Sequence, residues 1–261
     1  MGKTKINESF KRVKDRNEKA FVPYIMAGDG GLEVTQERIE FLERCGVTAI
    51  ELGIPFSDPV ADGPTIQAAG IRALQQGTTL AAVLNHLQAH PREVPLILMT
   101  YFNSIFSYGI EKFVQDCDEA GVDGLIIPDL PIEEEHLITG ELGKKDIALI
   151  RLAAITSPED RIKEIALRTE GFLYAVTVTG TTGSRTSFHD NVETYLSHLS
   201  QSCSVPVLAG FGVSTPDHVR HLTNYCDGVV VGSKMIELFQ QRQFAEIEQL
   251  VQSAKDIHTL N

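Results

Sequence analysis

The chain has 261 residues and carries 23 lysine and arginine residues against 35 aspartate and glutamate residues, so its formal net charge is −12. This balance excludes a general nucleic-acid binder, because contacts to phosphate groups need clustered cations. The charged amino-terminal segment lacks the apolar core of a signal peptide, and no apolar run approaches the roughly 18 residues of a membrane span, so we expect a cytoplasmic protein without a membrane segment.

Eight apolar runs bounded by glycine, proline or aspartate recur along the chain. They lie at 20–28, 47–53, 94–102, 123–129, 147–153, 171–178, 205–212 and 227–233. Near-continuous runs of valine, isoleucine and leucine are typical of strands that are covered on both faces, as in a parallel sheet. We therefore predict eight parallel strands.

Amphipathic segments separate these runs and predict helices. In the segment 32–45 apolar residues recur at steps of three, and Gly46 is placed for the left-handed position after a helix. Ser157 and Thr215 each precede a proline and carboxylates, which predicts a helix N-cap at both positions. The last segment carries an apolar stripe that is expected to close the ring. The stripe consists of Phe244, Ile247, Leu250 and Val251.

Eight strands alternating with eight helices over about 250 residues predict a (β/α)8 TIM barrel that forms a single domain over residues 1–261. An open doubly wound sheet is the alternative, but no GxGxxG string follows the first strand. The longest crossover runs from Gly53 to Val94. Because the chemistry of a barrel lies in the loops at the carboxyl ends of its strands, this crossover is a candidate site.

Three carboxylates, Glu51, Asp58 and Asp62, lie at the start of that crossover. Glu51 interrupts an apolar strand, where burial raises a carboxyl pKa and suits the group to acid–base catalysis near neutral pH. A glutamate that reaches solvent or pairs with an arginine is the other reading. Asp58 and Asp62 are also typical of ordinary Asx turns. A divalent-metal site would use such residues, but no obvious matching ligand occurs elsewhere, and we expect no metal.

Histidine and cysteine spacing adds no metal centre. His218 and His221 lie three residues apart on a predicted helix, but they lack the acidic neighbour of an HExxH zinc site. The four cysteines form no CxxC pair, which favours reduced structural thiols.

Glycine-rich loops follow the sixth, seventh and eighth runs. Gly212, Gly232 and Ser233 fit a phosphate site made of backbone N–H groups and a helix N-terminus, and Gly183 can add another N–H. A tight turn explains any one of these glycines alone, but three such loops together favour phosphate binding. The hydroxyl-rich segment 177–191 is predicted to close over a substrate as a lid.

The string ELGIPFSDPVADGPTIQ at 51–67 resembles the signature of the tryptophan synthase alpha chain family. Further segments carry the resemblance over nearly the whole chain. They are FVPYIMAGD at 21–29, MTYFN at 99–103, GVDGLIIPDLP at 121–131, TGTTGSR at 179–185, GFGVSTP at 210–216 and GVVVGS at 228–233. The resemblance implies a (β/α)8 barrel with additional helices at the N-terminus and in the long crossovers. It also implies reversible retro-aldol cleavage of indole-3-glycerol phosphate to indole and D-glyceraldehyde 3-phosphate, with the indole passed to a beta chain for L-tryptophan synthesis.

The same resemblance implies roles for individual residues. Glu51 matches the catalytic acid/base, and Asp62 matches the carboxylate that binds the indole N–H. The implied substrate-binding residues are Phe21, Tyr101, Leu152, Tyr174, Thr182 and Phe211, of which Thr182 matches a residue that helps to hold Asp62. The implied phosphate-binding residues are Gly183, Gly212, Gly232 and Ser233. Asp58 and Asp129 resemble residues near the contact with the beta chain.

No cofactor is implied in this chain, since pyridoxal phosphate is expected in the partner beta chain of an alpha2beta2 heterotetramer. A free-standing indole-3-glycerol phosphate lyase and a non-catalytic phosphate-binding barrel are the alternatives. None of the predicted strands carries an interior lysine, which disfavours an imine-forming aldolase. Pro128 and Arg151 depart from the small or apolar residues expected in strand-like runs.

Overall fold

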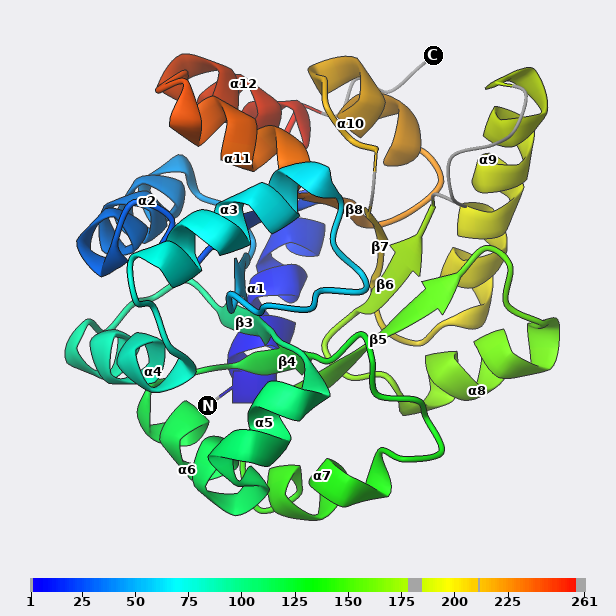
Figure 1. Cartoon of the computed structure of the whole chain (residues 1–261). Coiled ribbons are helices and arrows are strands. Elements are labelled where there is room, and N and C mark those ends of the chain that lie inside the picture. Colours follow the sequence, from blue (N-terminus) through cyan, green and yellow to red (C-terminus); the bar gives the residue numbers. More distant parts are fainter. Residues whose placement is uncertain (1, 178–184, 211, 257–261) are drawn as a thin grey trace.

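The computed structural model describes residues 2–177, 185–210 and 212–256, with the backbone alone for 185–191. Over these residues the chain forms a closed barrel of eight parallel strands surrounded by helices (Figure 1). The strands are β1 (Ala20–Met26), β2 (Ile50–Gly53), β3 (Leu96–Met99), β4 (Gly124–Ile126), β5 (Ala148–Ala154), β6 (Leu173–Val176), β7 (Val207–Gly210) and β8 (Gly228–Val231). The predicted barrel is confirmed.

Twelve helices occur in the described parts of the chain. They are α1 (Gly2–Asp15), α2 (Leu32–Cys45), α3 (Pro64–Gln75), α4 (Leu80–Ala89), α5 (Phe102–Tyr108), α6 (Ile110–Glu119), α7 (His136–Leu142), α8 (Glu159–Arg168), α9 (Arg185–Ser202), α10 (Pro216–Leu222), α11 (Ser233–Gln240) and α12 (Phe244–Ser253). The additional helices expected at the N-terminus and in the long crossover after β2 are therefore present, as α1 and as the pair α3 and α4.

The strands separate two apolar layers, because successive side chains of a strand point to opposite faces. On β1, Val22, Tyr24 and Met26 belong to the layer inside the barrel. Phe21 and Ile25 belong to the layer between the barrel and the helices. β1 closes the barrel because it pairs with β2 on one side and with β8 on the other.

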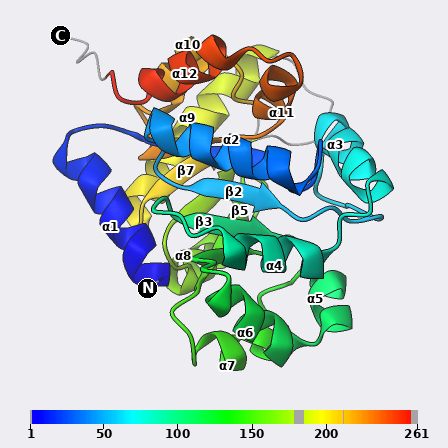
Figure 2. The same cartoon turned by 90° about the vertical axis from the view of Figure 1, so that its left-hand side faces the viewer.

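Helix α1 covers the amino-terminal mouth of the barrel. Ile6 and Phe10 pack into the interior layer, where the ring centroid of Phe10 lies 5.5 Å from that of Phe172. The Ser9 hydroxyl donates a hydrogen bond of 2.6 Å to the carbonyl of Thr48, just before β2. Figure 2 shows α1 at this end of the strands and α3 beyond their carboxyl ends. A site that solvent can reach therefore belongs at the carboxyl ends.

The predicted helix ends are correct in two of three cases. Gly46 takes the left-handed conformation after α2 with a φ of 71°. The Thr215 hydroxyl accepts a hydrogen bond of 3.2 Å from the N–H of His218 and caps α10. The prediction for Ser157 is wrong, because the extended Pro158 (ψ 150°) is itself the N-cap and α8 begins only at Glu159.

The apolar stripe of α12 packs as predicted over most of its length. Ile247, Leu250 and Val251 are buried, whereas Phe244 at the start of the helix is 41% exposed. The ring of Phe244 meets that of Phe41 on α2 at 5.2 Å in an edge contact. This contact joins the last helix to the second one and completes the outer ring.

Arg151 on β5 points away from the barrel interior and forms a two-pronged ion pair. Its Nε and Nη2 atoms donate to the two carboxyl oxygens of the buried Glu135 over 2.6 and 2.7 Å. An arginine in this strand is therefore explained by its partner beside α7.

Three further findings concern the described residues only. No helix among them is long and apolar enough to cross a membrane. They contain no group of three or more residues that could hold a metal ion, and His221 instead lies 3.0 Å from a carboxyl oxygen of Glu193. Cys45, Cys117, Cys203 and Cys226 are free thiols.

Candidate active site

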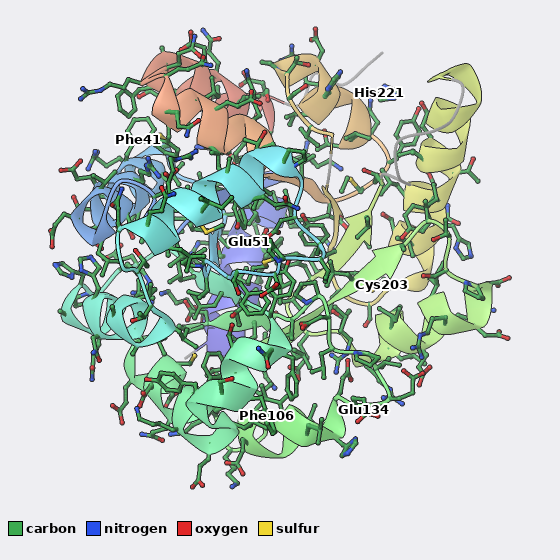
Figure 3. The ribbon with its side chains drawn as sticks, in the orientation of Figure 1. Phe41, Glu51, Phe106, Glu134, Cys203 and His221 are labelled. Atoms are coloured by element: carbon green, nitrogen blue, oxygen red, sulfur yellow. The ribbon has the colours of Figure 1, made fainter. Side chains whose placement is uncertain are left out.

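A cavity of about 360 Å³ lies at the carboxyl ends of the strands. Residues from every strand, or from the loop that follows it, line this cavity. The lining includes Tyr24, Glu51, Ala61, Asp62, Gly63, Ile66, Met99, Ile126, Pro128, Leu152, Tyr174, Gly212, Val213, Ser214, Val230, Gly232, Ser233, Lys234 and Glu237. Figure 3 shows Glu51 near the centre of the barrel.

Glu51 is held inside the barrel by β2, between the buried residues Ile50 and Leu52. Its exposed fraction is 4%. Burial, together with the nearby charge of Asp62, raises the pKa of Glu51 to about 8. Its Oε2 atom has no hydrogen-bond partner among the described residues. The reading of Glu51 as a solvent-facing glutamate is therefore wrong, and the carboxyl group carries a proton at neutral pH.

Asp62 reaches the cavity on the loop between β2 and α3. The Gln67 side chain donates a hydrogen bond of 2.8 Å to the carbonyl of Asp62. The Tyr101 hydroxyl accepts one of 3.0 Å from the N–H of Ala61, and the Tyr101 ring stacks on Phe56 at 5.1 Å. Tyr101 thus lies beneath the loop and holds it in place.

Glu51 and Asp62 differ in their surroundings. Burial raises the pKa of Asp62, while a hydrogen bond from the Tyr101 hydroxyl lowers it in part. No such donor reaches Oε2 of Glu51 from the part of the chain that the structure describes, and Glu51 is the more deeply buried of the two. Two carboxyl groups with different pKa values can take different catalytic roles. The group that keeps its proton acts as an acid, and the other acts as an anion.

The end of β8 and the start of α11 form the part of the wall suited to an anion. α11 begins at Ser233 directly after Gly232, and its first turn contains no acidic residue. The first N–H groups of a helix lack partners within the helix, and the helix dipole attracts negative charge there. Gly212, after β7, has a φ of 80°, in the left-handed region that favours glycine. This part of the wall therefore suits an anionic group.

Two glycines make room for the two tyrosines of the cavity. A Cβ atom on Gly53 would lie 1.9 Å from the hydroxyl oxygen of Tyr24. A Cβ atom on Gly210 would lie 2.1 Å from Cε1 of Tyr174. Each tyrosine therefore leans across the end of the next strand, over a position that has no side chain.

The structure places three of the six predicted substrate-binding residues at or near the cavity. Leu152 and Tyr174 line it, and Tyr101 lies beneath the Asp62 loop. The prediction for Phe21 is wrong, because Phe21 lies on the outer face of β1 against the helices, and Tyr24 from the same strand lines the cavity instead. Thr182, Gly183 and Phe211 lie outside the described residues.

The segment predicted to act as a lid, 177–191, is only partly described. Thr177 is buried, and its hydroxyl donates a hydrogen bond of 2.7 Å to the carbonyl of Gly210. From Arg185 onward the chain is helical, as the start of α9. Residues 178–184 of the predicted lid lie outside the described residues.

Several lining residues were missed when the sequence was read alone. They include Tyr24, Ile66, Met99, Ile126, Val213, Ser214, Val230, Lys234 and Glu237. The sequence alone did not mark the strand residues among them, because the register that makes Tyr24 the partner of Glu51 and Met99 the partner of Ile126 is set by the closed barrel. Residues in register with a catalytic candidate face the same interior.

Asp58 and Asp129 are exposed on loops that follow β2 and β4. The Asp129 carboxylate accepts a hydrogen bond of 2.8 Å from the N–H of Phe102, the first residue of α5. It therefore joins two neighbouring loops at the same end of the barrel as the cavity. Both aspartates are accessible to a partner at that end.

The buried Asp29 fixes the helix that follows the Asp62 loop. Its carboxylate accepts hydrogen bonds of 2.7 and 2.9 Å from Arg72 on α3. Arg38 on α2 lies 3.6 Å from the same carboxylate. The helix that follows the Asp62 loop is thus tied to the loop after β1.

Comparisons with known proteins agree with this geometry. The family model for the tryptophan synthase alpha chain matches residues 10–260. A tryptophan synthase alpha chain of Oceanobacillus iheyensis is 53% identical over 256 residues, which cover 97% of this chain and 98% of that protein. One of Listeria welshimeri is 51% identical and covers 96% of this chain and 98% of that protein.

Solved structures are similar over nearly the same length. A chain from Aquifex aeolicus superposes with a TM-score of 0.88 at 35% identity and covers 98% of this chain and 100% of that one. The alpha subunit of tryptophan synthase from Legionella pneumophila superposes with a TM-score of 0.86 at 31% identity. The match covers 96% of this chain and 98% of that one.

Proposed function

This chain belongs to the family of tryptophan synthase alpha chains, and from that premise we propose how its cavity carries out the reaction of the family. The reaction is the reversible retro-aldol cleavage of indole-3-glycerol phosphate to indole and D-glyceraldehyde 3-phosphate. The indole passes to the beta subunit for the synthesis of L-tryptophan. The observation that carries our assignment is the buried, protonated Glu51 opposite a second carboxyl group in a cavity with phosphate donors at its wall.

The chemistry requires an acid at C3 of the indole ring. Indole is a poor leaving group until C3 is protonated, and the ring nitrogen then carries positive charge. Glu51 donates the proton to C3 and takes a proton from the glycerol hydroxyl as the carbon–carbon bond breaks. A pKa of about 8 lets one group serve both steps, because neither protonation state is strongly disfavoured near neutral pH.

Asp62 stabilises the positive charge on the indole nitrogen. Its carboxylate accepts the ring N–H in a cavity where nearby charges are poorly screened, so its attraction strengthens as the charge develops. The contacts of Gln67 and Tyr101 with the loop support this role, since they hold the backbone that carries Asp62 before the substrate arrives. Tyr174 and Leu152 supply the apolar wall for the ring.

The phosphate group binds at Gly212, Gly232 and Ser233 through backbone N–H groups, and Gly183 joins this site in our proposal, while Thr182 helps to hold Asp62. Phe211 is assigned to the substrate pocket on the same grounds of family membership. An acidic chain binds an anion this way because the donors are local and need no basic patch. The reaction itself is acid–base chemistry, so this chain needs no cofactor of its own, and pyridoxal phosphate belongs to the beta chain.

The family implies a beta-chain partner, and we assign an alpha2beta2 heterotetramer in which residues 1–261 act as one barrel domain. Asp58 and Asp129 lie at the partner contact, which is supported by their exposure on the cavity end of the barrel. Indole formation from the substrate is measured with and without a beta chain. Activation supports the complex, whereas equal rates in both conditions contradict it.

The catalytic assignment is tested with Glu51→Gln. The variant is expected to bind indole-3-glycerol phosphate but to release no indole, because the amide cannot donate and retrieve a proton. Binding is followed by calorimetry and indole by its absorbance. Glu134→Gln, at an exposed glutamate far from the cavity, serves as the matched control (Figure 3). Turnover by Glu51→Gln at the rate of the control would refute the mechanism.

A further inference from the structure

Tyr24 is the one residue of β1 in the cavity lining, and the mechanism above gives it no task. The side chain is 3% exposed. Its hydroxyl has no hydrogen-bond partner among the described residues, a condition it shares there with Oε2 of Glu51. A buried hydroxyl left without a partner is costly, so such a group in a cavity indicates that a ligand supplies the partner.

The position of the hydroxyl follows from the barrel register. Tyr24 is the Cα partner of Glu51 on the adjacent strand. Because a Cβ on Gly53 would lie 1.9 Å from the Tyr24 hydroxyl, that oxygen lies over the carboxyl end of β2. The other end of the side chain is near β8, since a Cβ on Gly232 would lie 3.9 Å from Cβ of Tyr24. The tyrosine therefore extends from the phosphate wall toward the acid/base.

The substrate has to span the same interval. Its phosphate is assigned to Gly232 and Ser233 after β8, and its reacting carbon to Glu51 on β2. β1 lies between these two strands in the barrel. The three-carbon chain that joins phosphate to indole carries two hydroxyl groups, and it passes along β1 where Tyr24 stands.

We propose that the Tyr24 hydroxyl hydrogen-bonds the glycerol chain of the substrate at the hydroxyl group nearest Glu51. Tyr24 is then a substrate-binding residue that discriminates for a hydroxylated chain. The inference rests on the function proposed above. Burial and the neighbouring carboxyl groups Asp62 and Glu51 raise the pKa of Tyr24 well above its usual value, so the phenol stays protonated and remains a donor.

The test compares two ligands that differ only in the chain hydroxyls. One is indole-3-glycerol phosphate and the other is 3-(indol-3-yl)propyl phosphate, which keeps the ring and the phosphate. Both are titrated by calorimetry into Glu51→Gln, which blocks turnover, and into Glu51→Gln combined with Tyr24→Phe. The substitution is expected to weaken binding of the hydroxylated ligand roughly tenfold, as for the loss of one hydrogen bond, and to leave the other affinity unchanged.

If the affinity for both ligands falls equally, Tyr24 acts through packing alone. If neither affinity falls, Tyr24 has no role in binding. Each result overturns the proposal. A second measurement uses Tyr24→Phe with Glu51 intact. The substitution is expected to lower kcat/KM at every pH but to leave unchanged the pH above which kcat/KM declines. A move of that pH would show that the hydroxyl acts on Glu51 instead of the substrate and would also overturn it.

Tyr195→Phe is the matched control, because it removes a hydroxyl that is buried away from the cavity and donates 2.7 Å to the carbonyl of Ala153. This variant is expected to lose thermal stability but to keep both affinities. Failure of the proposed function looks different. In that case the chain with Tyr24 intact forms no indole and Glu51→Gln binds neither ligand.

Discussion

Replacing Glu51 with glutamine is expected to make the folded chain more stable, by an amount that depends on pH. The substitution keeps the shape of the side chain and removes its ability to ionise. The wild-type carboxyl group ionises near pH 4.5 in the unfolded chain but only at about 8 in the folded one, mainly because burial disfavours the charged form. Folding therefore works against the ionisation of this group.

The size of the effect follows from linkage between proton binding and folding. Below pH 4.5 both states are protonated, and Glu51 has no effect on the pH dependence of stability. As the pH rises from 4.5 to 8 the unfolded chain loses the proton while the folded chain keeps it, so stability falls. At about 1.4 kcal/mol per pH unit, the loss reaches roughly 3 kcal/mol at pH 7. Glutamine has no such loss.

Thermal unfolding followed by circular dichroism measures this difference. For a chain of this size, about 3 kcal/mol corresponds to a rise in Tm of roughly 10 °C at pH 7. The difference between Glu51→Gln and wild type is expected to shrink toward zero at pH 4 and to grow up to about pH 8. Glu134→Gln is expected to show no such trend, because Glu134 is exposed. A gain that is the same at every pH, or a loss at pH 7, would refute the reasoning.

Three further outcomes test other parts of the structure. For indole formation by the wild type, kcat/KM is expected to fall about tenfold per pH unit above pH 8, because the proton of Glu51 is then lost; a constant rate to pH 10 contradicts its role as the acid. Gly212→Val is expected to weaken binding of D-glyceraldehyde 3-phosphate, since a branched residue is strained at a φ of 80°; unchanged affinity in calorimetry counts against the phosphate site. Arg151→Met is expected to lower the free energy of unfolding in urea by about 3 kcal/mol because Glu135 stays buried without its close partner, while replacing both residues with apolar ones costs much less. Equal losses in the single and double variants would contradict this reading of the pair.

The barrel was predictable from the sequence because apolar runs and amphipathic helix signals alternate along the whole chain. Each of the eight runs overlaps one strand, of which only β5 extends beyond its run, by one residue, and the helices lie in the crossovers and at the two ends of the chain. Glu51 and Asp62 were also predictable, since a carboxyl group in an apolar strand and a proline-rich loop after it are local features. The family resemblance then added the chemistry.

The direction of side chains on β1 was not predictable for a physical reason. All seven residues of β1 are buried, because a parallel barrel covers both faces of its strands. No polar residue marks the outer face, so Phe21 and Tyr24 look equally suited to the interior. Only the closed register, with Tyr24 beside Glu51, separates them.

Contacts between distant segments were equally hidden. Tyr101, just after β3, accepts a hydrogen bond from the Asp62 loop. Arg151 on β5 forms an ion pair with Glu135, which precedes α7. Ser157 failed as an N-cap because the backbone conformation of Pro158 decided where α8 begins. Such outcomes depend on packing and local dihedral angles that residue types alone do not specify.

Gly53 and Gly210, the strand-end glycines beneath Tyr24 and Tyr174, limit how the cavity can be redesigned. Any side chain added at position 53 competes for space with the Tyr24 hydroxyl, and position 210 stands in the same relation to Tyr174. A single exchange at either glycine is therefore expected to fail, whereas an exchange made together with a smaller residue in place of the tyrosine can succeed. At these two strand ends the cavity can be enlarged or refilled only by changing a pair of positions on adjacent strands, and a library that varies one position at a time would miss every such variant.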